Sequence, residues 1–275
     1  MVSFDFLFWF FLVGLIIALL QDLKRREIDN WLNLFLLIGG SSYFVFVATF
    51  ENNLSILFVL GFVIVAMFIL MNLFYYSRVF AGGDAKLLFA MAPLFVGATY
   101  VSSLFNLGVF VLFLMLAGSL YGLSYSLVLF GKKLEEVLKL FRKEYVRLQV
   151  KYYLFSGMIL LLLGFFNAYF FIFAGLVISF PLVFVFAKSL ENVCMVKFVS
   201  GKDLQEGDWL VDDIVLGKKT IEANHDGLSK KDIVLLKHKK MIKIKEGLPF
   251  APAFLLGFLG YYFLQDWLLG ALFGI

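Results

Sequence analysis

The chain has 275 residues, of which 62% are hydrophobic, 19% aromatic and only 16% charged. Soluble domains are about half apolar and a quarter charged, so this composition excludes an ordinary soluble protein and predicts a polytopic membrane protein. The net charge of +4 could suit an anionic partner such as nucleic acid, but the positions of the basic residues favour an explanation through membrane topology. The single cysteine, Cys194, excludes an internal disulfide and a zinc site built from cysteines.

Apolar runs long enough to span a membrane recur along the whole chain. A hydrocarbon layer of about 30 Å requires roughly 17–25 residues of helix. The first run carries Asp5 and no preceding Lys or Arg, so we expect a retained helix and not a cleaved signal peptide. Eight spans are predicted, near residues 2–21, 31–50, 54–76, 87–103, 105–130, 152–167, 168–188 and 249–272.

The basic residues all occur in alternate connections between these runs. The 24 Lys and Arg residues lie in 22–30, 77–86, 131–151 and 189–248, with Lys188 at the edge of the last segment. Because cytoplasmic loops are enriched in Lys and Arg, these four segments are expected to face the cytoplasm. Both termini are then expected outside.

The segment 131–151 is predicted to form an amphipathic cytoplasmic helix on the membrane surface. Its apolar residues recur at helical spacing with charges between them: Leu134, Val137, Leu138, Phe141, Tyr145 and Leu148.

The segment 189–248 is predicted to be a small α+β module. A strand-like run covers 209–216 and is followed by a turn at Gly217. Ser229 and Asp232 have the spacing of a capping box for a short helix, and 241–245 reads as a last strand.

Two acids lie where spans meet the predicted cytoplasmic side. Asp84 follows the third span within Phe80-Ala81-Gly82-Gly83-Asp84-Ala85-Lys86-Leu87, and Asp22 ends the first. Acids beside a bilayer are costly, which makes them candidates for function. Two carboxylates at one depth can share a proton, so that one activates a water and the other protonates a carbonyl.

Residues beside Asp84 are expected to support it. Gly82 and Gly83 should allow backbone conformations closed to other residues and the close approach of another chain. Lys86 is expected to snorkel to the headgroups rather than to lower the pKa of Asp84, and Lys24 and Arg26 are expected to do the same beside Asp22.

These motifs resemble those of type IV prepilin peptidases, particularly the archaeal prepilin and preflagellin peptidases of the GxGD aspartic protease group. The residues that carry the resemblance are Asp22-x-Lys24-x-Arg26-x-Ile28-x-Asn30 and Ala81-Gly82-Gly83-Asp84-Ala85-Lys86. Stretches of 200–209, 227–229 and 247–254 are similar to the C-terminal region of one archaeal branch.

The resemblance implies that Asp22 and Asp84 are catalytic. Ala81 departs from it, because the first residue of the motif is glycine in the family. Bacterial relatives also N-methylate the product and carry a four-cysteine zinc element, which this chain cannot build. Peptidase activity without methyl transfer, metal or organic cofactor is therefore expected.

The implied partners are pilin or archaellin precursors and the lipid bilayer, with no nucleic acid; the oligomeric state stays open. Such enzymes remove a short basic leader at the cytoplasmic face. Glu27 and Asp29 are candidates for binding that leader, although a solvated loop is an equal reading, and Asn30 could bond freed backbone groups or substrate.

Two alternative functions are considered. A presenilin-like intramembrane protease also uses GxGD, but its partner acid lies in a Tyr-Asp pair, which this sequence lacks. An ion-coupled transporter would place its acids near the midplane on helices related by a repeat, whereas these acids lie at one interface.

The predicted fold class is an all-α polytopic membrane protein of about eight transmembrane helices with a small α+β cytoplasmic module. Its parts are a catalytic transmembrane region, an amphipathic helix, a helix pair, the module and a last span, at 1–130, 131–151, 152–188, 189–248 and 249–275.

Overall fold

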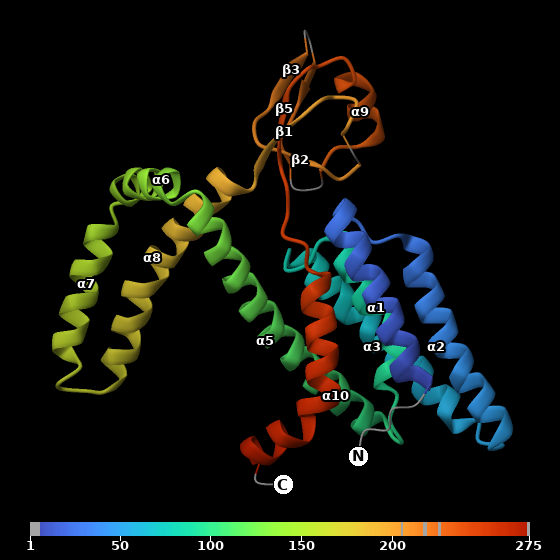
Figure 1. Cartoon of the computed structure of the whole chain (residues 1–275). Coiled ribbons are helices and arrows are strands. Elements are labelled where there is room, and N and C mark those ends of the chain that lie inside the picture. The colour runs from blue at the N-terminus through green and yellow to red at the C-terminus, as the bar shows by residue number, and fades with distance from the viewer. Residues whose placement is uncertain (1–5, 205, 217–218, 225–226, 274–275) are drawn as a thin grey trace. The chain divides into compact units, whose positions relative to one another are not determined.

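The computed structural model describes residues 6–204, 206–216, 219–224 and 227–273 (Figure 1). Five of its helices are long and apolar enough to cross a membrane: α1 (Phe6–Arg25), α2 (Asn30–Phe50), α3 (Ser55–Tyr76), α5 (Tyr100–Lys132) and α8 (Tyr169–Cys194). The pair α6 (Leu134–Arg147) and α7 (Val150–Leu163), bent by 72°, adds a sixth if it counts as one span. The protein is a multi-pass membrane protein, and among the described residues these criteria give five or six spans rather than eight.

The predicted fourth span, 87–103, is wrong as a single helix. The chain forms a short helix, α4 (Gly82–Ala90), then a 3₁₀ turn, η1 (Ala92–Phe95), and α5 begins only at Tyr100. Pro93 lacks an N–H and disfavours a continuous helix through this point, and the Gly97 N–H donates to the Ser103 hydroxyl instead of to a helical carbonyl. The break leaves α4 short, with Asp84 in its first turn.

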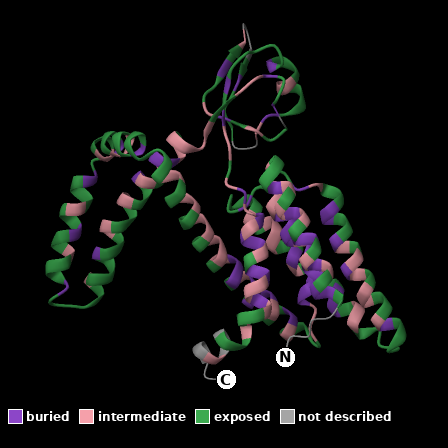
Figure 2. Cartoon of the chain, viewed as in Figure 1, coloured by how far each residue is buried: buried purple, intermediate pink, exposed green. Residues whose placement is uncertain are grey.

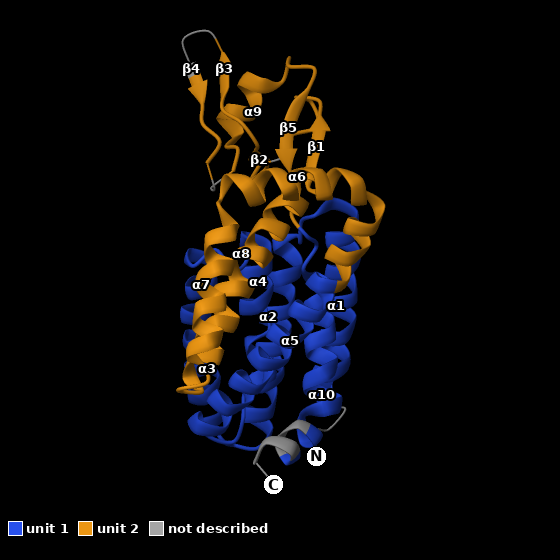
Figure 3. Ribbon diagram, turned by 90° about the vertical axis from the view of Figure 1, so that its left-hand side faces the viewer, with its two compact units in different colours: residues 1–123, 248–275 blue, residues 124–247 orange. Residues whose placement is uncertain are grey.

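The chain divides into two compact units (Figure 3). The first, 1–123 and 248–275, contains α1 to α4, the start of α5, and α10 (Ala251–Phe273) over the eighth predicted run. Its buried residues gather where helices face one another, whereas outer faces are exposed (Figure 2). Small residues let helices approach closely, as where Leu36 packs against Gly14.

The second unit, 124–247, contains the rest of α5, a helical hairpin and a small module. The predicted amphipathic segment forms α6, ending with Arg147. The buried carboxylate of Glu144 on α6 pairs with Lys188 on α8 at 3.2 Å and with Arg147 at 3.1 Å. This ion pair joins α6 to α8.

The module is built on an antiparallel sheet in the order β1 (Val196–Val199), β5 (Ile242–Lys245), β2 (Trp209–Leu210). A hairpin of β3 (Ile214–Leu216) and β4 (Lys219–Ile221) and helix α9 (Lys230–Leu236) complete it. In the central strand, Ile242 and Ile244 are buried and contribute to the core.

Most predicted features of the module are present. The capping box of Ser229 and Asp232 is formed, and the last strand lies at Ile242–Lys245. The run 209–216 is two short strands instead of one, separated at Asp212 and Asp213; Asp213 accepts a hydrogen bond from the Ala223 N–H at 2.7 Å. The predicted turn at Gly217 lies outside the described residues.

Candidate active site

Asp22 lies in the last turns of α1 and is buried, with 6% of its surface exposed. Its Oδ2 accepts a hydrogen bond from the backbone N–H of Ala251 at 2.9 Å, across 229 residues of sequence. The backbone N–H of Phe250 also donates to this carboxylate. Both donors lie at the start of α10, where Ala251 is the first helical residue and Phe250 immediately precedes it. We call these two residues the α10 start.

The sequence explains why a helix begins at this point. Ala251 is the first residue of α10 and Pro252 the second. Proline is well tolerated in a first helical turn, where backbone N–H groups have no partner within the helix. A carboxylate at such an N-terminus satisfies these donors and is favoured by the helix dipole. Asp22 fills this role from another helix.

Asp84 lies in the first turn of α4, and its side chain is partly buried. The carboxylate accepts a hydrogen bond from the backbone N–H of Ala81, the residue before the helix. Burial, and after it the negative charge of Asp22, together raise the pKa of Asp84 to about 7. The two acids are therefore electrostatically coupled within one unit.

The glycines do not act as predicted. Among the described residues the only glycines with positive φ are Gly207 and Gly227, so Gly82 and Gly83 adopt conformations open to any residue. A Cβ on Gly82 or Gly83 would make only ordinary contacts, at 3.7 Å from Tyr75 and 3.9 Å from the Ile28 backbone nitrogen, so neither position requires glycine within the chain, and the approach of another chain stays a prediction. Ala81 has φ −67° and ψ 162°, an ordinary extended conformation that does not require glycine.

Lys86 and Asn30 contact each other. Lys86 Nζ donates to Asn30 Oδ1 at 2.9 Å, which joins α4 to the first residue of α2. Lys86 is exposed, and its ammonium group makes this contact between helices; that it reaches the headgroups stays a prediction. Burial of Asp84 and the charge of Asp22, not Lys86, set the pKa of Asp84.

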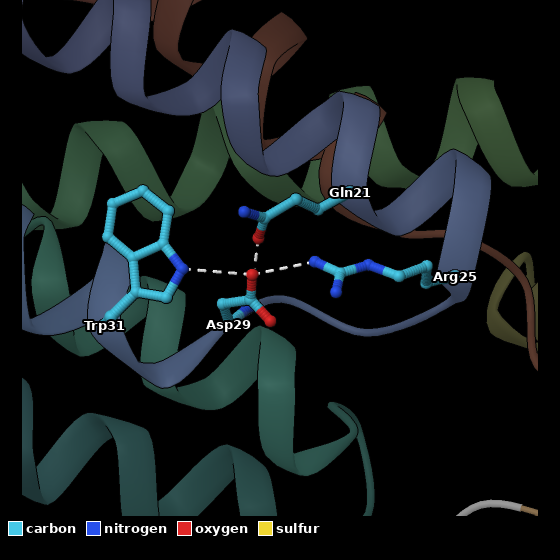
Figure 4. Close-up of polar contacts among 4 residues, drawn as sticks. All are labelled: Gln21, Arg25, Asp29 and Trp31. Carbon is cyan, nitrogen blue, oxygen red and sulfur yellow. Dashed lines mark hydrogen bonds and ion pairs between the residues drawn. The ribbon is translucent and has the colours of Figure 1, made fainter.

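Asp29 is held by its neighbours in the connection between α1 and α2 (Figure 4). Its Oδ2 accepts from Arg25 at 2.7 Å and from the Trp31 indole at 3.0 Å, and its backbone N–H donates to Gln21 at 3.0 Å. The hydrogen bond from Arg25, together with that from Trp31, holds the pKa of Asp29 below its ordinary value. Glu27 is exposed. Of the two candidate leader-binding acids, Asp29 is already committed to internal contacts.

Three features of the site go beyond the prediction. The first feature is the contact of the α10 start with Asp22. The span at 249–272 was predicted, and Pro249 and Pro252 mark its start on the same predicted side as the acids, which is the signal that could have placed it in the site. Arg26 has φ +60°, its Nη1 is buried, and its charge acts on Asp22, so it is not the surface anchor expected. Asn33 is 7% exposed, and neither amide atom has a hydrogen-bond partner among the described residues.

An open apolar groove of about 430 Å³ lies elsewhere in this unit. It is lined by Phe6, Gly39, Ser42, Tyr43 and Phe46, and includes neither acid. Its lining is apolar and lacks titratable acids, so the groove is not the candidate site.

Comparison with known proteins identifies the region that holds the two acids. Residues 9–127 match the model of the Type IV leader peptidase family. This region belongs to that family. The match indicates a protease of the prepilin peptidase type, a family that acts on pilin-type precursors. No curated protein and no solved structure matches the chain. The matched region includes Asp22 and Asp84, whereas α10 and the module lie beyond it.

Proposed function

We propose that the protein is a membrane aspartic endopeptidase that removes the short basic leader from type IV pilin-like or archaellin precursors. Asp22 and Asp84 would activate a water between them, without metal, organic cofactor or methyl transfer. The observation that carries the proposal is the coupling of these two carboxylates, which come from separate helices of the family-matched region. Coupled carboxylates are suited to sharing one proton.

In the proposed reaction, the ionised acid takes a proton from water, and the water oxygen attacks the scissile carbonyl carbon. The protonated acid gives its proton to the carbonyl oxygen, which forms a neutral gem-diol. The first acid, now protonated, passes its proton to the leaving nitrogen as the C–N bond breaks. The second acid recovers a proton from a diol hydroxyl, so both acids return to their starting states.

The proposed orientation follows from the basic residues. All 24 Lys and Arg residues lie in the segments assigned to the cytoplasm, which include the ends of α1 and α3 beside the acids. The hydrophobic helix of the precursor would enter the bilayer, and the scissile bond would lie at the depth of Asp22 and Asp84. Glu27, which is exposed in the connection after α1, is the available acid for a basic leader.

The test is cleavage of a pilin-type precursor by purified protein in detergent. Asp22→Asn and Asp84→Asn should each abolish cleavage while the protein stays folded, and Glu51→Gln, an exposed acid at the other end of α2, should cleave normally. Full processing by Asp84→Asn would contradict the proposal.

The cleavage site distinguishes the alternatives. The new N-terminus should lie just before the precursor's hydrophobic helix. A cut inside that helix would indicate a presenilin-like protease, and ion flux in liposomes without cleavage would indicate a transporter.

A further inference from the structure

The start of α10 contacts the segments that carry both acids. The backbone N–H of Ala251 donates to Asp22 at 2.9 Å, and the ring of Phe250 lies 5.3 Å from the ring of Phe80. Phe80 immediately precedes Ala81, the residue that caps α4 and donates to Asp84. The first residue of α10 and the residue before it therefore touch both halves of the candidate site.

The contact with Phe80 is well packed. Phe80 is 5% exposed, and its ring also lies 5.6 Å from Phe254 and 4.9 Å from Phe74. Aromatic pairs at these separations add to the stabilisation from burial. Gly118 on α5 leaves the space that the Phe250 ring occupies. These contacts hold the segment before Asp84 against the same helix start that binds Asp22.

The hydrogen bonds also distinguish the two acids. A backbone N–H can only donate, so the Oδ2 atom that receives the Ala251 N–H acts as an acceptor. The backbone N–H of Ala251 points its positive end at Asp22 from the first turn of α10, where the helix dipole also favours a negative charge. Asp84 has one backbone donor, from Ala81, and faces the charge of Asp22. When the pair holds one proton, these surroundings place it on Asp84.

We infer that the start of α10 is a third element of the catalytic centre, in which the Ala251 N–H positions Asp22 as the ionised base and leaves Asp84 as the acid. This inference rests on the proposed peptidase function and deepens it. Asp22 takes the proton from water, and Asp84 protonates the carbonyl oxygen of the substrate. Ala251 is a positioning residue, because it acts through Asp22.

The first test is Ala251→Pro. Proline is favoured at the first position of a helix, so this change removes the N–H that Asp22 accepts and keeps the backbone compatible with the helix. Ala251→Val adds similar bulk and keeps the N–H. We expect Ala251→Pro to lower kcat for precursor cleavage by about tenfold or more with little change in KM, as for a lost hydrogen bond to a charged group. Ala251→Val should retain most of kcat.

A second variant avoids added bulk at this buried position. Replacing Ala251 by lactic acid through nonsense suppression converts the N–H to an ester oxygen and leaves the side chain unchanged. The ester variant should show the same loss of kcat. In an Asp22→Ala background, it should cost no further thermal stability, whereas in the wild-type protein it should lower the unfolding temperature.

The outcomes separate this inference from the proposed function. Cleavage by Asp22→Asn would overturn the peptidase assignment itself. If Asp22→Asn is inactive but the ester variant cleaves with the wild-type kcat, the role of the α10 start is wrong and the peptidase assignment stands. A second result would also overturn the inference. If Ala251→Val and the ester variant lose kcat equally, and the ester lowers the unfolding temperature as much in the Asp22→Ala background as in the wild-type protein, the effect is packing alone.

Discussion

Lys86 donates a hydrogen bond to Asn30 at 2.9 Å, although 56 residues separate them in sequence. Asn30 begins α2, just after the connection that follows Asp22, and Lys86 lies on α4 two residues after Asp84. The bond therefore joins the two helices that flank the candidate site. Since both residues are exposed, we expect it to matter more for the position of α4 than for overall stability.

Lys86→Met should reduce precursor cleavage several-fold and change the unfolding free energy by about 1 kcal/mol or less, because an exposed hydrogen bond contributes little net stability. Cleavage kinetics and thermal unfolding in detergent measure the two effects. Lys24→Met is the matched control, since Lys24 is exposed on the same predicted side. An equal loss of cleavage in both variants would show that only basic charge matters.

Asp29→Asn should lower the thermal stability of the connection between α1 and α2, because Asp29 accepts hydrogen bonds from Arg25 and Trp31. The folded-state pKa of Asp29 lies below its ordinary 3.8, so its contribution is present above that pH and is lost as the pH falls through the lowered value. The stability difference from wild type should be largest at neutral pH and vanish in acid.

Glu27→Gln serves as the control for Asp29→Asn. Glu27 is exposed, so the change should leave thermal stability unaltered and raise KM for precursors with basic leaders if Glu27 meets the leader. A rise in KM for Asp29→Asn with unchanged stability would instead make Asp29 the leader-binding acid.

The pairing of the two acids can be predicted from the sequence because the distribution of Lys and Arg assigns both acids to the same side of the membrane. This prediction requires no contact to be known. Lys and Arg positions assign the ends of the first and third spans to one side, and the charge of Asp22 contributes to the raised pKa of Asp84, as expected for acids in one unit. The fourth span is mispredicted because hydropathy does not register the break at Pro93. An apolar run can be a short buried helix and a turn just as well as a spanning helix.

Contacts between distant segments are the features that sequence reasoning misses. The bond from Ala251 to Asp22 depends on how α10 packs in the bundle, and the two prolines around it indicate only that a helix begins there. Gly82 and Gly83 suggest unusual backbone angles, but glycine composition alone does not distinguish a positive φ from a close approach. In the structure, neither glycine has a positive φ, and a Cβ at either position would make only ordinary contacts.

Precursor cleavage should fall as the pH rises through about 7, where Asp84 loses the proton that the reaction needs, because burial and the charge of Asp22 raise its pKa to that value. Folding stability should change in the same direction. A raised carboxyl pKa gives stability that is full below the ordinary 3.8 and is lost as the pH rises through the folded-state value.

Asp84→Asn provides the control for this pH dependence. The variant should unfold at a higher temperature than wild type at pH 8 and show a smaller decline in stability between acid and neutral pH, because no charge forms at the site. Thermal unfolding across pH measures both. An unchanged pH dependence in the variant would contradict the burial of a titrating Asp84.

Asn33→Leu should stabilise the protein and reduce its activity. Asn33 is buried on the face of α2 that packs inward, and its amide has no hydrogen-bond partner among the described residues. Replacing such a group by an apolar one of similar size is neutral or stabilising, by about 1 kcal/mol or more when desolvation is relieved. A buried amide without a partner, in the first turn of the helix whose first residue contacts Lys86 on α4, is expected to serve substrate or water, so cleavage should fall.

Asn72→Leu is the matched control for Asn33→Leu. The Asn72 amide already donates to the Phe68 carbonyl at 2.7 Å, so its replacement should give no gain in stability. Wild-type activity together with higher stability in Asn33→Leu would assign Asn33 no role in the reaction.

Gly227→Ala should destabilise the small module without removing peptidase activity. Gly227 has φ +76°, and a Cβ there would collide with the backbone of Gly207; a left-handed conformation alone costs a non-glycine residue about 1–2 kcal/mol. Limited proteolysis of 200–247 should accelerate in Gly227→Ala, whereas Gly247→Ala, where a Cβ meets open space, should leave the proteolysis rate unchanged.

Precursor cleavage by Gly227→Ala should stay within about twofold of wild type, as for distant independent sites, because the hydrogen bonds of Asp22 and Asp84 lie within the other unit. A collapse of cleavage in Gly227→Ala but not in Gly247→Ala would show that the folded module takes part in catalysis.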